Sequence, residues 1–225
     1  MLGKFYVVAT PIGNLTDLSE RAKTTLANVD VILCEDTRVT HKLLSAIGVQ
    51  KQTFSYHQHS GQDKTRFAID TLEFGKNLAI VSDAGTPAIS DPGGKLVEEL
   101  VDHFGERLTI IPIPGPCAIT SALSIAGFPA DEFLFLGFPP HKKGRGAFFS
   151  RVGKSLCTVV FYESTHRILK TLDELAQSIS DRRIVVCREL TKVHETVYRG
   201  TASEVTNALK TGSIKGEFVI VVSPI

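Results

Sequence analysis

A long polar loop, Ser82–Gly94, constrains the fold of this chain more than any other segment. The apolar run Leu78–Val81 before it indicates a buried parallel strand, and Lys95–Val101 after it has helical spacing. Connections of this kind usually have about 2–6 residues, so the loop is longer than a simple connection needs. Its glycines allow a ligand to approach the backbone, and its prolines fix its shape. Because ligands bind beyond the carboxyl ends of parallel strands, we predict a binding loop here, with an ordered loop of no function as the alternative.

The rest of the chain alternates strand and helix patterns, which predicts an α/β fold of two consecutive domains. The proline-rich turn Pro114–Pro116 is the expected boundary, so we predict an N-terminal α/β domain over 1–113 and a C-terminal α/β domain over 114–225. The remaining predicted strands cover 5–9, 29–34, 53–56, 108–113, 133–138, 157–162, 184–187, 195–199 and 218–222. The remaining helices cover 20–27, 63–74, 119–126 and 202–209, with one through Leu43 that stops at Gly48 and one from a cap at Ser164 to about Ile179.

Composition excludes several classes of protein. The 225 residues carry a net charge of +1, from 25 basic and 24 acidic side chains, so any contact with RNA needs a local basic patch. The four cysteines form no C-x-x-C pair, which favours reduced thiols over zinc. A metal site at His57-x-His59 lacks an obvious third ligand, and a solvated loop is the better interpretation. Without a signal peptide or an apolar run near the roughly 18 residues of a membrane span, we expect a soluble cytoplasmic protein.

Several common nucleotide-binding and catalytic motifs are absent from the sequence. There is no G-x-x-x-x-G-K-[ST], no G-x-G-x-x-G after the first strand and no G-x-S-x-G. Polar clusters instead follow several predicted strands, as a small-molecule site with several parts requires. Any single cluster has a structural alternative, such as an ion pair and helix cap within Glu35–Arg38. The clusters are Thr10–Asn14, Glu35–Arg38, Ser82–Gly94, Pro114–Ala118, Glu163–Arg167 and Arg188–Lys192.

The motifs in and around these clusters together resemble the ribosomal RNA small subunit methyltransferase I family of the tetrapyrrole methylase superfamily. They are Val7–Leu15, Glu35–Arg38, Ser82–Pro87, Pro114–Pro116, Phe161–Arg167 and Arg188–Lys192. The resemblance extends from the first strand to Gly216-Glu217-Phe218, which is nearly the whole chain. Two departures stand out: Thr165 lies where many relatives carry proline, and the chain ends at Ile225 where longer members have a C-terminal extension. If that extension grips RNA, we expect weaker RNA binding from these 225 residues.

The resemblance implies two α/β domains of the tetrapyrrole methylase type, with S-adenosyl-L-methionine in the cleft between them, and a homodimer. It implies methyl transfer to the 2′-hydroxyl of a cytidine ribose in small-subunit (16S) ribosomal RNA. The loops after Ala9, Val81 and Ile113 then hold the cofactor, and small residues near Cys117 suit a flat adenine. The proposed cofactor contacts are Pro11, Ser82, Asp83, Gly85, Thr86, Pro87, Cys117, Ala118 and Tyr162, although Tyr162 fits a core aromatic equally well.

For the reaction, the enzyme chiefly aligns the methyl group with the ribose oxygen. A base that accepts the hydroxyl proton would increase the rate further. The sequence does not choose among the candidate bases Glu35, Asp36, Glu163, His166 and Glu189. Arg38 and Arg167 are predicted to hold phosphates, and we expect their two clusters to face each other across the cleft. The predicted RNA patch comprises Lys142, Lys143, Arg145 and Arg151, with a solvated loop as the alternative.

Two other functions stay open at this point. The chain is compatible with a methyltransferase for a tetrapyrrole or a modified amino acid, although the basic loop and Glu35–Arg38 argue against it. It is also compatible with a non-catalytic RNA-binding assembly factor, although the intact Ser82–Gly94 loop argues against that.

Overall fold

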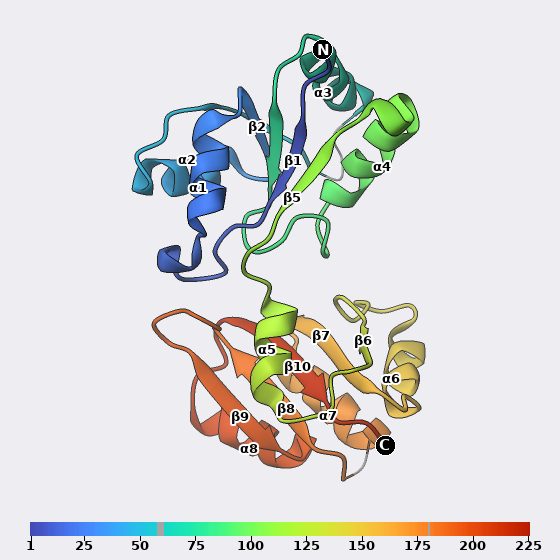
Figure 1. Ribbon diagram of the computed structural model, residues 1–225. Coiled ribbons are helices and arrows are strands. Elements are labelled where there is room, and N and C mark those ends of the chain that lie inside the picture. Colours follow the sequence, from blue (N-terminus) through green and yellow to red (C-terminus); the bar gives the residue numbers. More distant parts are fainter. Residues whose placement is uncertain (58–60, 180) are drawn as a thin grey trace. The chain divides into compact units, whose positions relative to one another are not determined.

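The structure is a computed structural model that describes residues 1–57, 61–179 and 181–225. The chain divides into two units, Met1–Cys117 and Ala118–Ile225, each with a five-stranded sheet (Figure 1). The division therefore lies after the Pro114–Pro116 turn that the sequence indicated. Both units combine a sheet with helices, which confirms the predicted α/β class.

The first unit has a fully parallel sheet in the order β3-β2-β4-β1-β5. Parallel strands end on the same edge, so the loops that follow β1, β2, β4 and β5 share one edge of this sheet. The strands are β1 (Phe5–Val8), β2 (Val31–Cys34), β3 (Gln52–Ser55), β4 (Leu78–Val81) and β5 (Ile110–Ile113).

Helices cover both faces of this sheet. Helices α1 (Glu20–Asn28) and α2 (Thr37–Ala46) cover one face, and α3 (Gln62–Glu73) and α4 (Gly93–Phe104) cover the other (Figure 1). The strand residues are apolar on both sides because each face needs a core. Short 3₁₀ turns, η1 (Leu15–Asp17) and η2 (Gly105–Arg107), complete the unit.

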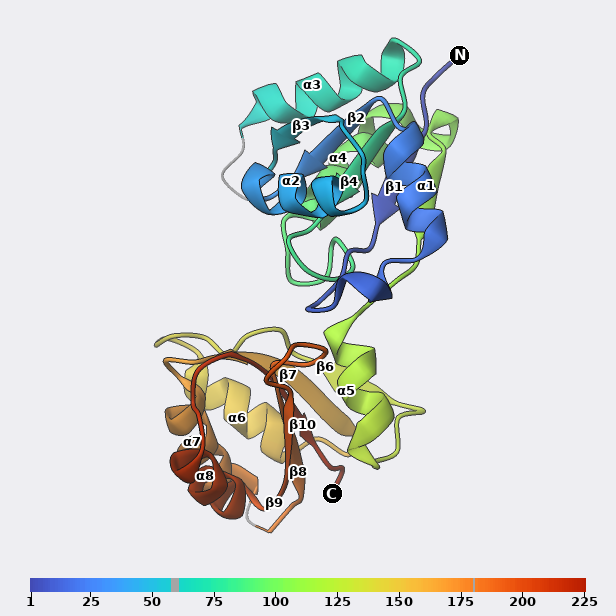
Figure 2. The same ribbon diagram turned by 90° about the vertical axis from the view of Figure 1, so that its left-hand side faces the viewer.

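The second unit has a mixed sheet in the order β6-β7-β10-β8-β9, in which β6 and β7 pair in parallel and the other neighbours are antiparallel. Figure 2 shows α7 and α8 on one side of this sheet and α5 on the other. The strands are β6 (Phe133–Phe135), β7 (Thr158–Ser164), β8 (Ile184–Arg188), β9 (Thr196–Gly200) and β10 (Glu217–Val222). The helices are α5 (Ala118–Ala126), α6 (Arg145–Gly153), α7 (Ile168–Ile179) and α8 (Ala202–Thr211).

The structure corrects two local predictions. Helix α6 starts inside the segment that we expected to be a basic loop, and it buries Phe149 and Val152. Its N-cap is Gly144, which has no side chain to cap the helix, so the sequence lacked the usual start signal. Helix α7 begins at Ile168 rather than after Ser164, because Ser164 still belongs to β7.

None of the helices in the described ranges is long and apolar enough to span a membrane. The four cysteines, all within the described ranges, form no disulfide bond, and Cys34 and Cys187 are buried. The sequence motif His57-x-His59 falls partly outside the described residues, because it includes His59.

Candidate functional site

Backbone hydrogen bonds join the loops after β1 and β4. The N–H of Thr10 donates to the carbonyl of Gly85 at 2.9 Å, and the N–H of Gly85 donates back to Thr10 at 3.1 Å. The buried Thr10 hydroxyl also donates to the Ser82 carbonyl at 3.1 Å. Two strand-end loops that are far apart in the sequence are therefore fixed to each other at the carboxyl edge of the sheet.

Two glycines bring the loop after β5 into the same group. Gly85 has a φ of +90°, and a Cβ there would lie 3.3 Å from Ile12 Cγ2. A Cβ on Gly115 would lie 2.9 Å from the Cβ of Ala9, closer than real Cβ atoms approach. The Thr86 hydroxyl donates to the Pro116 carbonyl at 3.2 Å. The three loops predicted to hold a cofactor thus lie together, and glycine is required where they meet.

The far half of the Ser82–Gly94 loop is strained and is held by one carboxylate. Ala88 and Ser90 have positive φ angles of 72° and 61°, which are unusual for residues other than glycine. Asp91 Oδ1 accepts hydrogen bonds from the N–H groups of Ala88 at 2.8 Å and Gly93 at 2.7 Å. Asp91 Oδ2 is buried and has no hydrogen-bond partner. Strain of this kind persists only where the surrounding contacts enforce it, so this loop has a specified shape.

Three carboxyl groups near this edge have raised pKa values. Burial is the largest cause for Glu35, and the nearby charges of Asp91 and Asp83 raise its pKa further. Partial burial also raises the pKa of Asp91, and the partial desolvation of the otherwise exposed Asp83, with the charge of Asp36, raises the pKa of Asp83. Asp83 Oδ1 accepts a hydrogen bond from the N–H of Asp36 at 3.1 Å, which joins the loop after β2 to the loop after β4.

The pKa of Asp36 is lowered instead, because Asp36 is paired with Arg38. Arg38 Nη2 lies 2.5 Å from Asp36 Oδ2, and the N–H of Arg38 donates to Asp36 Oδ1 at 2.8 Å as Asp36 caps α2. These hydrogen bonds lower the pKa of Asp36 to about 2. The Arg38 side chain is 86% exposed. The ion pair and helix cap considered as a structural alternative are therefore both present.

The other proposed cofactor residues are placed as follows. The Ser82 hydroxyl is buried and donates to the Gly85 carbonyl at 3.2 Å. Pro87 is buried, whereas Pro11 and Thr86 are half-buried and Asp83 is exposed. In the chain between β5 and α5, Cys117 is half-buried, and so is Ala118, the first residue of α5.

A buried ion network lies in the second unit, where two predicted site residues and one predicted RNA contact meet. The Glu163 side chain is 0% exposed, and its Oε1 lies 2.9 Å from Arg167 Nη2. Its Oε2 accepts a hydrogen bond from the Thr171 hydroxyl at 2.6 Å. The same hydroxyl accepts from Arg145 Nη2 at 2.6 Å, and Arg145 Nε lies 2.6 Å from Glu174 Oε2.

This network corrects the expected role of Arg145. Its side chain is 7% exposed and is bound to Glu174, so it does not present its charge to RNA. Arg167 is also largely buried, with its guanidinium on Glu163, and both Glu163 oxygens already accept hydrogen bonds. The sequence missed Thr171 and Glu174 as partners because they carry no motif and lie on α7.

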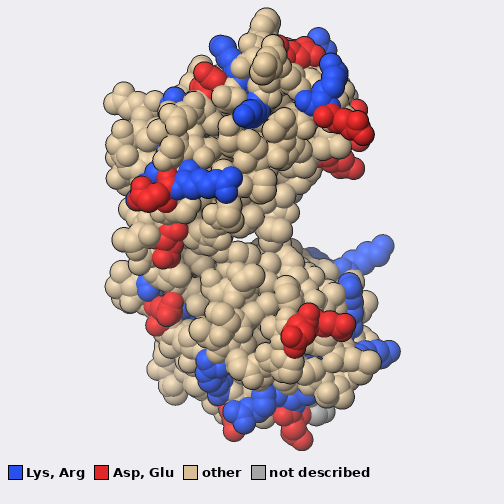
Figure 3. Space-filling view, in the orientation of Figure 1, with Lys and Arg blue, Asp and Glu red and all other residues tan. Residues whose placement is uncertain are grey.

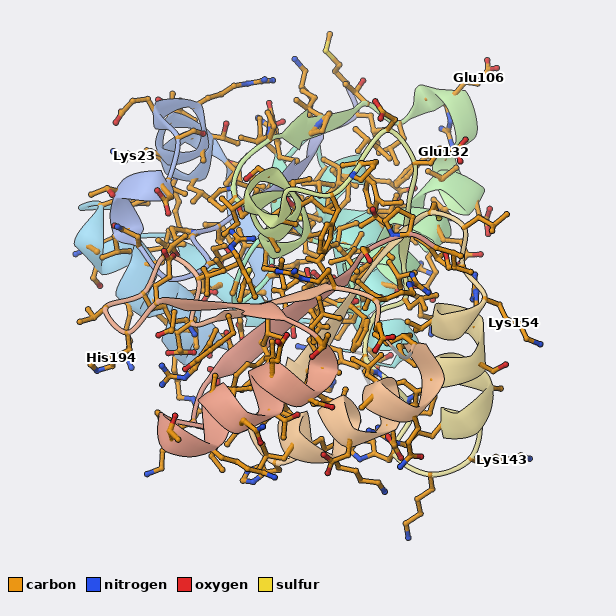
Figure 4. The ribbon with its side chains drawn as sticks, turned by 90° about the horizontal axis from the view of Figure 1, so that it is seen from below. Lys23, Glu106, Glu132, Lys143, Lys154 and His194 are labelled. Atoms are coloured by element: carbon orange, nitrogen blue, oxygen red, sulfur yellow. The ribbon has the colours of Figure 1, made fainter. Side chains whose placement is uncertain are left out.

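The remaining basic candidates are exposed. Lys142 and Lys143 precede α6, and Arg151 lies on its last turn. Figure 4 shows Lys143 and Lys154 extending outward at opposite ends of α6. On the face shown in Figure 3, basic side chains lie among acidic ones rather than in one large field.

Three further predicted residues lie at strand ends of the second unit. Tyr162, in β7, has its ring centroid 5.1 Å from that of Phe135 and 5.3 Å from that of Phe138. His166 is exposed in the turn before α7. Glu189 Oε1 accepts hydrogen bonds from Lys192 Nζ at 3.0 Å and from the Glu217 N–H at 2.9 Å. The predicted facing of the Glu35–Arg38 and Glu163–Arg167 clusters stays a prediction.

Within the described residues, no group of three or more His, Cys, Asp or Glu side chains has an arrangement that could hold a metal ion. Burial is the largest cause of the raised pKa values of Glu35, Asp83 and Asp91. Acidic neighbours raise the pKa further at Glu35 and at Asp83.

Comparison with known proteins gives consistent matches. The family model of the Tetrapyrrole (Corrin/Porphyrin) Methylases matches residues 4–206. The chain is 43% identical over 221 residues to the ribosomal RNA small subunit methyltransferase I of Halalkalibacterium halodurans, covering 98% of this chain and 75% of that protein. It is 40% identical over 222 residues to the protein of the same name from Thermotoga maritima, covering 99% of each.

A solved structure has the same fold. Uroporphyrin-III C-methyl transferase from Thermus thermophilus, complexed with S-adenyl homocysteine, superposes with a TM-score of 0.66 at 16% identity. The match covers 98% of this chain and 97% of that one. The two-unit architecture is therefore that of a known methyltransferase fold.

The Asp36–Arg38 pair predicts a pH effect. With a folded-state pKa of about 2, below its usual 3.8, Asp36 stabilises the fold above about pH 4. That contribution is lost as the pH falls through 2. Arg38→Ala removes the side-chain partner but keeps the backbone N–H, so the pKa of Asp36 should rise toward 3.8. Carboxyl-carbon NMR titration measures it, with Arg66→Ala, which removes the partner of Asp70, as the control. An Asp36 pKa still near 2 in Arg38→Ala would contradict the assignment.

The buried network predicts a stability effect at Thr171. Thr171→Val leaves Glu163 Oε2 and Arg145 Nη2 without their shared partner, so the unfolding free energy of the second unit should fall by roughly 2–3 kcal/mol. Thr206→Val is the matched control, because the buried Thr206 hydroxyl donates only to the Ala202 carbonyl of its own helix. Its loss should be about 1 kcal/mol or less. Urea unfolding measures both, and equal losses would mean that the network contributes no more than a single helix hydrogen bond.

Proposed function

This chain belongs to the ribosomal RNA small subunit methyltransferase I family of the tetrapyrrole methylases, and we propose that it methylates the 2′-hydroxyl of a cytidine ribose in small-subunit ribosomal RNA. The match over nearly the whole chain to proteins of that name carries the proposal. S-adenosylmethionine is the methyl donor, in agreement with the S-adenyl homocysteine in a solved relative of the same fold. The fold itself hosts more than one substrate class, so the substrate follows from the family and not from the architecture.

The joined loops of the first unit fit this cofactor. Gly85 and Gly115 keep the loops after β1, β4 and β5 in backbone contact, and any larger residue would intrude there. Asp83 presents an exposed carboxylate at the same edge. We assign to Asp83 the binding of a polar or positively charged part of the cofactor, since a carboxylate accepts charge-assisted hydrogen bonds.

The carboxylates around the loop favour one general base. When bound, S-adenosylmethionine supplies an activated sulfonium methyl group. Glu35 is half-buried, and burial and its acidic neighbours raise its pKa, which makes it a stronger base. Of the five candidates we therefore propose Glu35 to accept the ribose hydroxyl proton, a contribution of about 10²–10⁴-fold in rate. Glu163 is unsuited, since it is fully buried and its oxygens are occupied.

RNA binding is assigned to exposed cations. Lys142, Lys143, Arg151 and Arg38 are all exposed, and we propose that they contact phosphates. Arg145 and Arg167 leave this set because they are buried in ion pairs. A homodimer and a cytoplasmic location remain part of the proposal, on the strength of the family resemblance.

The alternative functions lose support. A tetrapyrrole substrate is named for solved structures that share at most 19% identity with this chain, whereas relatives at 40% identity and above carry the ribosomal RNA name. A non-catalytic assembly factor would not need the strained Ser82–Gly94 loop to keep its shape.

Mapping of methylated riboses tests the function directly. Small ribosomal subunits incubated with the protein and S-adenosylmethionine should gain one methyl group on a cytidine ribose, read by mass spectrometry of RNA fragments. Asp83→Ala should weaken cofactor binding in calorimetry by roughly tenfold or more, because it removes a charged hydrogen-bond acceptor. Asp17→Ala, an exposed acidic residue of η1, is the control. Methylation of a base, or no methylation with a bound cofactor, would refute the ribose assignment.

The exposed lysines predict a change in salt dependence. If Lys142 and Lys143 each contact a phosphate, replacing both with alanine should reduce the slope of log affinity against log salt by about 1.4 for single-stranded RNA. Cofactor affinity should not change, because both lysines belong to the second unit and the loops assigned to the cofactor belong to the first. Lys154→Ala, at the other end of α6, serves as the control (Figure 4). An unchanged slope in the double variant would assign these lysines to solvent.

A further inference from the structure

Two buried guanidinium groups fix the segment between β6 and α6. Arg167 Nη1 donates to the Pro139 carbonyl at 2.7 Å, and Arg145 Nη1 donates to the Pro140 carbonyl at 3.1 Å. Each arginine is anchored by its own carboxylate, Glu163 and Glu174 respectively. Two consecutive backbone carbonyls are thus held from inside the unit, so the residues on either side of them have a defined position.

The residue before this anchored pair is an exposed aromatic. Phe138 is 50% exposed, although its neighbour Pro139 is buried. Its ring lies 5.3 Å from that of Tyr162 at an angle of 53°, so one side of Phe138 is supported. The backbone is fixed as well, because the Tyr162 N–H donates to the Gly137 carbonyl at 2.9 Å. The ring is therefore held at the surface with little freedom to turn inward.

Two cationic side chains follow the anchored prolines, separated from them by His141. Lys142 and Lys143 are exposed in the turn that leads into α6. An exposed aromatic ring followed by lysines in the same short segment is a combination that proteins use for unpaired nucleotides, since bases stack on the ring and phosphates contact the cations. Packing within the fold does not explain why Phe138 is exposed, because its ring packs against Tyr162 on one side only.

We propose that Phe138 stacks against an unpaired base of the RNA substrate, with Lys142 and Lys143 on the adjoining phosphates. This inference rests on the proposed function, and it assigns Arg145 and Arg167 as positioning residues rather than phosphate contacts. The positioning comes from the Pro139 and Pro140 carbonyls, which fix the backbone on which Phe138 and the lysines sit.

Filter binding with radiolabelled small-subunit ribosomal RNA and the full chain tests the stacking. Phe138→Leu keeps an apolar side chain but removes the aromatic face, and it should weaken RNA binding about tenfold. The salt slope should stay at its wild-type value, because no charge is lost. Phe138→Tyr should restore the affinity. Phe133→Leu is the matched control, because Phe133 is 43% exposed on β6 and precedes no lysine pair.

Wild-type affinity in Phe138→Leu, or an equal loss in Phe138→Tyr, overturns the proposal. A change of oligomeric state in Phe138→Leu, read by sedimentation, also overturns it, because the ring would then serve contact with a second copy. Ribose mapping separates this outcome from failure of the function. A wild-type protein that binds RNA through Phe138 but methylates no ribose refutes the enzyme assignment alone, whereas ribose methylation with unchanged KM for RNA in Phe138→Leu refutes the stacking alone.

Discussion

The backbone pair between Thr10 and Gly85 is the contact on which the first unit's strand-end edge depends. It joins the loops after two neighbouring parallel strands, and the Thr10 hydroxyl adds a bond to the Ser82 carbonyl. Because Gly85 has a positive φ and close neighbours, the join tolerates no side chain at that position. The parallel sheet places the loops after β1 and β4 at one edge, and the Thr10–Gly85 hydrogen bonds join them there.

The acidic groups beside that surface have different pKa values because their surroundings differ. Asp36 is paired with an exposed arginine and has a pKa of about 2, whereas burial raises the pKa of Glu35 one residue earlier. Adjacent carboxyl groups thus differ in their affinity for a proton, because Glu35 is half-buried beside other acidic groups and Asp36 has a cationic partner. The same principle separates acid from base in other enzymes, and here it favours Glu35 as the proton acceptor.

The sequence predicted the fold and the loops of the first unit because apolar runs define strands and glycine–proline clusters define their ends. It failed at Arg145, since nothing local reveals that a charge in a basic run will meet Glu174, on a helix 29 residues away in the chain. It also missed helix α6, which begins at Gly144 without a capping side chain. The positive φ angles of Ala88 and Ser90 were equally invisible, because nothing in these residue types signals them; Asp91 Oδ1 holds the N–H of Ala88 in this conformation.

The buried network around Thr171 makes the local backbone conformation independent of the salt concentration. Its two guanidinium groups and two carboxylates are balanced in charge, and the pair of Glu163 and Arg167 is largely closed to water. Counterions screen exposed charges within about 10 Å at ordinary ionic strength but reach buried pairs far less. Salt therefore acts on the exposed lysines and leaves the anchored backbone between them and Phe138 in place. We therefore expect salt to change how strongly the lysines attract an anion, while the backbone that positions them keeps its place.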